Sequence, residues 1–452
     1  MKCLCTLQLT SEGACSSLAL GMVLSSINTQ LPQLRHLTLT SKHSWAGERA
    51  VWEQLGESTQ LTRLAISFDK TVGVGAQVKD LTPLSSLTGL QSLGFQLFNR
   101  GALLQLDGVD PGDAGFLAHL TALTELQGDF VLKPGMLQHI SSCTALQSLW
   151  LRAGFFVRPS SSDWQGLGEL THLTMLHVTG SILRDQGPQP FYSSLQHLRS
   201  LQEVRVSPNN GHWTWAAVPA LAALTKLTSV SGDWAVGDEG LESNGVCEQV
   251  VWLCEASGSV PFKAFPNVKR VVLAGSLDTG SWESLGSCCP KVRKIERVCS
   301  ARNDAVWPSV PAAATGAERV AALRGLSQLT GLTQLAFNIS HKLEAAALAN
   351  AMQQVTGLRQ LMLGLCSSPE LDWGCLHPLG KLTTVTTAII ASRVPLASKQ
   401  DCQVLLSVLA HICYVLLTVS AADVATVREA VQESRAIGLE LPRRVQAKAF
   451  PM

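Results

Sequence analysis

One phrase recurs along this 452-residue chain: apolar residues at every third position, followed by a short alternation of apolar and polar residues. Clear copies are LTGLTQLAF at residues 329–337, LTHLTMLHV at 170–178 and LTGLQSLGF at 87–95. Most neighbouring copies lie 26 to 30 residues apart. A unit of this kind buries its apolar edge only against the next unit, so the repeat predicts a solenoid. The second apolar residue of each clear copy is Leu4, Leu34, Leu61, Leu90, Leu123, Leu146, Leu173, Leu201, Leu227, Leu332, Leu358, Val385 or Ile412.

The local pattern predicts one strand and one helical segment in each unit. The closing alternation is typical of a strand with one buried face. Helical stretches follow the polar turns, as at 16–27, 345–355 and 403–410. Helices are wider than strands, and the stack should therefore bend into a horseshoe. We expect an α/β fold with a parallel sheet on the concave side and helices on the convex side.

The phrase resembles the leucine-rich repeat (LRR) family, and the resemblance covers nearly the whole chain. The unit length of about 27 residues and the helical segments are most similar to intracellular, ribonuclease-inhibitor-like repeats. The Asn or Cys that the family places after the strand is mostly replaced here by Thr, Ser, Gly or Asp. We therefore expect irregular turns. The resemblance implies a scaffold that binds another protein on its concave surface.

The copies divide the chain into four predicted parts. Residues 1–300 form an N-terminal LRR array, in which the copies of 240–300 are weaker. Residues 301–318 are predicted to be an insertion or loop, because their prolines cannot continue a helix interior or a strand ladder. An LRR continuation at 319–420 follows. Residues 421–452 are predicted to form a terminal helix and a frayed basic tail.

Loops and ends deviate from the repeat. Extended loops are predicted at 186–190, 208–215 and 233–245 from their Gly, Pro and Asn content. No capping segment precedes Leu4, and the ends of a solenoid need a polar cover. We expect either that the chain is part of a longer protein or that a partner covers this end.

Composition and motifs argue against several functions. The chain has no G-x-S-x-G elbow, phosphate-binding Gly-Lys-Ser/Thr loop or H-E-x-x-H motif, so we predict that it is not an enzyme. Its 13 cysteines are scattered without paired ligand spacing, which favours free thiols over a metal site. No cofactor is predicted. The net charge of +1 argues against a generally nucleic-acid-binding surface. The N-terminus lacks a secretory pattern, so we predict a cytoplasmic protein.

The polar strand positions of adjacent copies form columns that should face solvent on the concave side. One column runs through Trp150, His177 and Arg205, and the next through Met175 and Glu203. Exposed Trp and Arg are the residues that dominate interface hot spots. The alternative is that Trp150 fills a gap in the sheet, and a slip of one residue would invert the assignment. The predicted protein-binding patch comprises Trp150, Arg152, Met175, His177, Glu203 and Arg205.

A basic segment gives a second candidate surface. Residues 261–302 hold eight basic and three acidic residues, a net charge of +5. An acidic protein surface or a nucleic-acid backbone could dock there, with affinity that falls with salt. A solvated face is the plainer interpretation. The predicted patch is Lys269, Arg270, Arg293 and Lys294.

The leading prediction is a non-catalytic protein-binding scaffold or adaptor that binds another protein and no metal. By family analogy, the alternatives are a substrate receptor of a ubiquitin ligase and a structural protein of the cilium or cytoskeleton. A further alternative is a membrane-attached receptor, because residues 404–419 are almost wholly apolar. That stretch is short for a span of about 20 residues and has His411 near its middle, and a buried helix followed by a buried strand explains it equally well.

Overall fold

The computed structural model describes most of the chain, and the predicted insertion at 301–318 lies outside the described residues. Backbone contacts divide the chain into two compact units, the N-terminal unit (Met1–Leu227) and the C-terminal unit (Thr228–Met452). The division falls inside the predicted 1–300 array. The described residues are 4–11, 17–41, 49–68, 81–97, 111–128, 135–152, 161–179, 189–207, 213–234, 246–277, 279–297, 320, 323–339, 342–365, 373–392, 398–420, 422–436, 439 and 441–449.

The described part of the N-terminal unit contains eight parallel strands, each paired with the next one along the chain. Pairing joins equivalent residues of successive copies, as in Leu149 with Leu176 and Leu176 with Val204. The sequence repeat is therefore the strand register. The strands are β1 (Thr6–Ser11), β2 (His36–Ser41), β3 (Arg63–Phe68), β4 (Ser92–Leu97), β5 (Glu125–Gly128), β6 (Ser148–Arg152), β7 (Met175–Thr179) and β8 (Glu203–Ser207).

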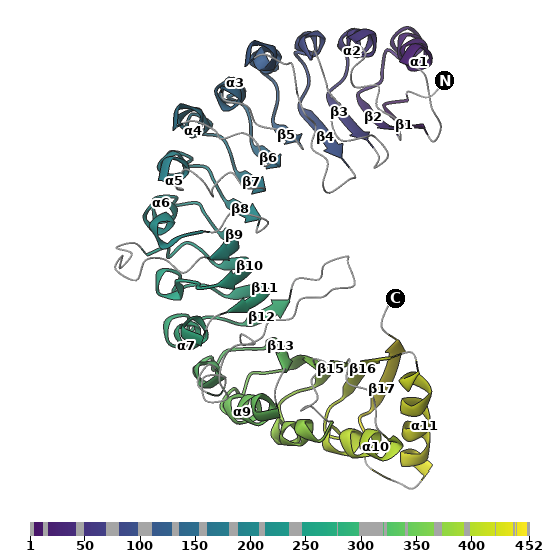
Figure 1. The fold of residues 1–452 in the computed structure, drawn as a ribbon, viewed down its shortest axis with the longest axis vertical. Coiled ribbons are helices and arrows are strands. Elements are labelled where there is room, and N and C mark those ends of the chain that lie inside the picture. Colours follow the sequence, from purple (N-terminus) through teal and green to yellow (C-terminus); the bar gives the residue numbers. More distant parts are fainter. Residues whose placement is uncertain are drawn as a thin grey trace. The chain divides into compact units, whose positions relative to one another are not determined.

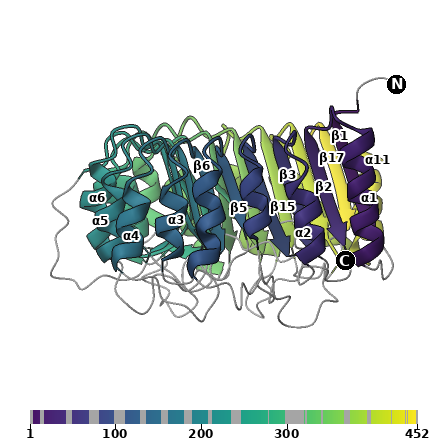
Figure 2. The same ribbon diagram turned by 90° about the horizontal axis from the view of Figure 1, so that it is seen from above.

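Helices of this unit lie along one face of its strands (Figures 1 and 2). Some are α-helices and others are short 3₁₀ segments (η), a mixture that the repeat did not predict. The ribonuclease-inhibitor-like subclass stays a prediction. The segments are α1 (Ser17–Gln30), α2 (Arg49–Gly56), η1 (Thr82–Ser86), η2 (Pro111–His119), α3 (Met136–Ser141), α4 (Ser161–Gly168), α5 (Gln189–Leu195), η4 (Trp215–Ala217) and α6 (Val218–Ala222).

The C-terminal unit repeats the plan with nine described strands, again parallel and paired in chain order. The strands are β9 (Ser229–Trp234), β10 (Trp252–Gly258), β11 (Arg270–Leu277), β12 (Lys294–Arg297), β13 (Gln334–Ile339), β14 (Gln360–Leu365), β15 (Thr387–Ser392), β16 (Tyr414–Val419) and β17 (Arg444–Ala449). The helical segments are η5 (Phe262–Ala264), α7 (Thr279–Cys288), η6 (Gly325–Gln328), α9 (Lys342–Met352), η7 (Trp373–Lys381), α10 (Lys399–Val408) and α11 (Asp423–Ala436).

Apolar positions of the phrase form the core between the strands and the helices. In the copy at 170–178, Leu170, Leu173 and Leu176 are all fully buried. Thr171 and His172, which separate the first two of them, are exposed. The predicted alternation of buried and solvent-facing positions is confirmed. Burial of a leucine side chain contributes roughly 1.5–3 kcal/mol, so the core of each unit rests on this periodicity.

A buried carboxylate links two successive helical segments. Asp163, in the first turn of α4, is buried, and its Oδ1 accepts a hydrogen bond of 2.5 Å from the backbone N–H of Gly135. Gly135 precedes α3 and has φ 88°, in the left-handed region that favours glycine. The backbone N–H of Gly135 thereby has a hydrogen-bond partner inside the protein.

Four predicted loops and ends need correction or comment. Residues 444–449 form β17, although the sequence predicted a frayed tail at 441–452. In the predicted loop 208–215, Trp213 is fully buried and Trp215 begins η4. In the predicted loops 186–190 and 233–245, the described residues belong to α5 and β9.

The apolar stretch 404–419 is divided between α10 and β16. This is the helix-and-strand interpretation of the sequence. His411 belongs to the turn that connects α10 to β16. The Nε2 atom of His411 is 3.0 Å from the carbonyl oxygen of Leu382. Among the helices that the structure describes, none has the length and apolar character needed to cross a membrane.

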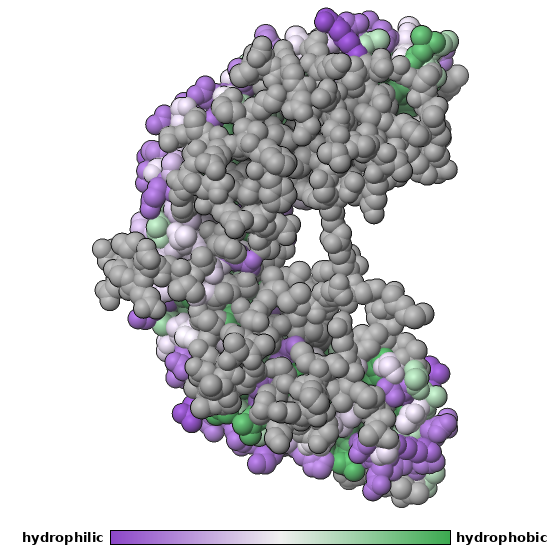
Figure 3. All heavy atoms as spheres, in the orientation of Figure 1, coloured by the Kyte–Doolittle hydropathy of each residue, from purple (hydrophilic) through white to green (hydrophobic). Residues whose placement is uncertain are grey.

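Apolar side chains are exposed at the first described strand and helix. Leu4 precedes β1, and Leu18, Met22 and Val23 lie on α1; all four are exposed. Hydrophobic atoms are visible over α1 in Figure 3. The core-side residues of α1 are nevertheless buried, as Leu24 and Ile27 show, like Val51 and Leu55 of α2.

Candidate protein-binding site

Strands β5 to β8 place the predicted columns on one face of the sheet. Gln127 pairs with Trp150, Trp150 with His177 and His177 with Arg205 in the strand register. Paired residues of adjacent strands lie about 4.8 Å apart, so their side chains form a continuous row. The residues on either side of them, such as Leu149 and Leu151, point into the core and are buried. The strand register thus aligns these residues as the sequence pattern predicts, and that the row binds a protein stays a prediction.

Trp150 and His177 form an aromatic stack at the centre of this row. Their ring centroids are 4.7 Å apart and the planes meet at 20°. Trp150 nevertheless keeps 41% of its surface exposed. Burial of the imidazole and, second, the positive charge of Arg205 lower the pKa of His177 to about 3. His177 is therefore neutral at physiological pH and acts as a flat, uncharged support for the indole.

The adjacent column adds a thioether and two carboxylates. Glu125 pairs with Ser148, Ser148 with Met175 and Met175 with Glu203. Met175 is 43% exposed, and its Sδ lies 3.8 Å from the Ser148 hydroxyl. At the other end, the Ser92 hydroxyl donates to Oε2 of Glu125 at 2.9 Å. Two large exposed apolar side chains, Trp150 and Met175, thus lie at diagonal positions of the neighbouring strands β6 and β7.

Five of the six predicted side chains come together in this way. The backbone of Arg152 pairs with Thr179 at the end of the row, but the side chain of Arg152 lies outside the described part. The five side chains, which we call the Trp150 surface, are Trp150, Met175, His177, Glu203 and Arg205. An apolar centre with charged neighbours is the composition of a protein-binding hot spot.

Sequence comparisons identify no relative: no family model and no curated protein matches the chain. Among solved structures, the chain is similar to an LRR protein of Leptospira interrogans. That similarity has 11% identity and a TM-score of 0.41, and covers 85% of this chain and 94% of the other. The fold follows from the geometry of the chain itself, because successive copies of the phrase form parallel strands, and a helical segment is described between every two successive strands except β9 and β10. The fold is an LRR solenoid.

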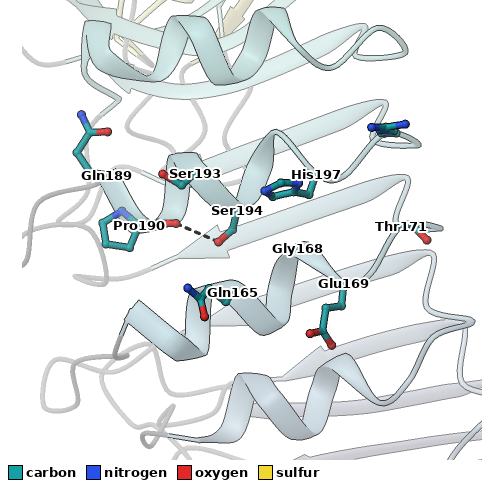
Figure 4. Close-up of a pocket in the computed structure, with 10 residues that line it drawn as sticks. Gln165, Gly168, Glu169, Thr171, Gln189, Pro190, Ser193, Ser194 and His197 are labelled. Atoms are coloured by element: carbon teal, nitrogen blue, oxygen red, sulfur yellow. Dashed lines mark hydrogen bonds between the residues drawn. The ribbon is translucent and has the colours of Figure 1, made fainter.

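The helical side of the LRR units offers a groove of about 820 Å³ between α4 and α5. It is lined by Gln165 of α4, by Glu169 just after α4, and by Gln189 and Ser193 of α5 (Figure 4). These four polar side chains are exposed. The groove lacks the exposed aromatic and thioether groups that distinguish the Trp150 surface, so it is the weaker candidate.

The described residues give little support for chemistry on this LRR frame. Among them, no group of three or more His, Cys, Asp or Glu is placed to hold a metal ion. Burial raises the pKa of the thiol of Cys143 to about 11 and those of Cys289 and Cys402 to about 12. These three thiols are protonated at neutral pH and are poor nucleophiles.

The predicted basic patch lies at the start of two neighbouring LRR strands, and the structure adds Trp252 to it. Arg270 of β11 pairs with Lys294 of β12, and Lys269 and Arg293 precede them. Trp252 of β10, which pairs with Arg270, is 46% exposed. Trp252 was not among the predicted site residues. A signal for it exists in the sequence, because Trp252 stands two residues after Val250, just as Met175 stands two residues after Leu173.

Proposed function

We propose that this chain is a non-catalytic protein-binding scaffold or adaptor whose Trp150 surface holds the partner. The observation that carries the proposal is the exposed indole of Trp150, which is stacked on a neutral His177, with the exposed Met175 on the neighbouring strand. A group of exposed apolar side chains rimmed by polar residues marks an interaction site more often than a single exposed residue does. The ubiquitin-ligase and ciliary roles, and the cytoplasmic location, stay predictions.

Preorganisation supports the same proposal. Immobilising a flexible side chain on binding costs about 0.5–1.5 kcal/mol. Here the stack with His177 and the strand backbone already restrict the indole, so less conformational entropy is lost when a partner covers it. Glu203 and Arg205, two residues apart on β8, supply opposite charges at the margin of the apolar centre. Such charges set the orientation and the specificity of a partner more than its affinity.

The test is affinity purification with the wild-type chain and a Trp150→Ala/Arg205→Glu variant. Removal of a hot-spot side chain costs about 2 kcal/mol or more, so we expect the variant to lose bound partners by roughly 30-fold. Arg63→Glu is the matched control, because Arg63 is exposed on β3 in the column of Met175 and carries the same charge reversal.

Stability of the Trp150→Ala single variant provides a second readout. Since the indole is substantially exposed, we expect its free energy of unfolding to lie within about 1 kcal/mol of the wild-type value. A loss of several kcal/mol would mean that the ring belongs to the core. The proposal is also wrong if the double variant keeps every partner that the Arg63→Glu control keeps.

A further inference from the structure

Four cations of the C-terminal unit lie at adjacent positions of adjacent strands. Lys269 and Arg270 lead into β11, and Arg293 and Lys294 lead into β12. The backbone N–H groups of Arg293 and Lys294 both donate to the carbonyl oxygen of Lys269, at 2.7 and 3.2 Å. Like charges opposite each other on a sheet repel and lower stability. An anion bound over this block would relieve the repulsion.

Acidic side chains of the chain compensate only part of this charge. The guanidinium of Arg270 forms an ion pair with Glu296, which lies on β12. Within the described residues, no acidic side chain pairs with Lys269, Arg293 or Lys294, and all three are exposed. Three exposed cations therefore lie within about one strand spacing of one another, and the guanidinium of Arg293 rests against Gly331 of the next repeat.

An exposed aromatic ring borders the cations. The guanidinium carbon of Arg270 lies 5.4 Å from the centre of the Trp252 ring, a cation–π contact that orders both side chains. The strand register produces the row Trp252, Arg270, Lys294, so the ring lies at one end and the uncompensated charge at the other. A ligand that fits this row carries an apolar group beside its negative charges.

The arrangement favours an acidic polypeptide over a nucleic acid. Single strands of nucleic acid bind along a positive groove with several stacking rings. Here the column that contains Arg270 and Lys294 continues into the uncharged Gln334 and Gln360. Carboxylates a few ångströms from an apolar side chain match the block more closely.

We propose that Trp252 together with Lys269, Arg293 and Lys294 is a second binding site, which takes an acidic peptide segment carrying an apolar side chain. Its carboxylates pair with the three cations, and its apolar side chain covers the Trp252 ring. The site shares no residue with the Trp150 surface, so the two proposals stand or fall separately.

A displayed library of random dodecapeptides, selected on the wild-type chain and on an Arg293→Glu/Lys294→Glu variant, tests the site. The wild-type chain should recover peptides rich in Asp and Glu next to a large apolar residue. Binding of a recovered peptide should fall at least tenfold in the double variant and about tenfold in Trp252→Ala. It should also fall between about 50 and 300 mM salt, as exposed charges become screened.

The matched control is Arg444→Glu/Lys448→Glu, which reverses two exposed charges on β17 of the same unit. This control should bind the recovered peptide like the wild type. The proposal is overturned if recovered peptides show no excess of acidic residues, or if the control loses as much binding as the Arg293→Glu/Lys294→Glu variant. Tighter binding of a single-stranded oligonucleotide than of the peptide would likewise overturn it.

Discussion

Replacing Leu173 by Asp should unfold the repeats around β6 to β8 and lower the free energy of unfolding by about 3–5 kcal/mol. Leu173 is fully buried, and its backbone N–H closes the turn to the carbonyl oxygen of Leu170 at 3.0 Å. A carboxylate at this position would be buried without a partner. It would lose its hydrogen bonds to water, and no group of the protein would replace them. Because repeats contact only their neighbours, the loss should begin locally.

Urea unfolding followed by circular dichroism measures this effect, and hydrogen exchange locates it. Thr171→Asp is the matched control, since Thr171 is exposed and lies two residues from Leu173. We expect that control to stay within about 0.5 kcal/mol of the wild type. Equal destabilisation by both variants would contradict the assignment of buried and exposed positions in the repeat.

Replacing Trp213 by Ala should lower the free energy of unfolding by about 3–5 kcal/mol, the usual cost of removing a buried aromatic side chain. The indole is fully buried and stacks on Tyr192, with ring centroids 5.9 Å apart at 16°. Phe191 lies 6.2 Å away from it, and Trp164 forms an edge contact with Phe191 at 5.0 Å. These rings join three successive repeats of the N-terminal unit.

Trp150→Ala is a natural comparison for Trp213→Ala, because both changes remove an indole from the same unit. Guanidinium unfolding should show a large loss for Trp213→Ala and a small one for Trp150→Ala. Near-ultraviolet circular dichroism should report loss of the stacked cluster in the first variant. Similar stability of the two variants would show that the two tryptophans are not in the different environments described above.

The repeat predicted the strands well because the requirement for apolar residues is met within each copy of the phrase. Each copy needs apolar residues at the positions of Leu170, Leu173 and Leu176 to fill its own section of the core. In a weak copy, such as the one at Val250, fewer of these positions hold leucine. The pattern therefore did not predict that Trp252 lies on a strand beside Ser229. The charged residues Arg444 and Lys448 made residues 444–449 look like a polar tail rather than a strand with alternating apolar and polar positions. Charged side chains are nevertheless common on edge strands.

Other features depend on packing between repeats and leave no local signal. Trp213 follows a stretch of Pro, Asn and Gly that predicts a loop, and its burial follows from the rings of α5. The columns of the Trp150 surface could be predicted from strand periodicity alone. The stack of Trp150 on His177, and the lowered pKa that goes with it, arise from contacts across strands that one sequence does not encode locally.

Site-specific photo-cross-linking tests the central claim, that the strand face around Trp150 binds a protein. A photoreactive amino acid would replace Met175 on the Trp150 surface or, as a control, Ser193 on the exposed face of α5. We predict a protein adduct from position 175 that is lost when Arg205→Glu is added, and no comparable adduct from position 193. Adducts from position 193 alone would contradict the account and move the binding surface to the helical side.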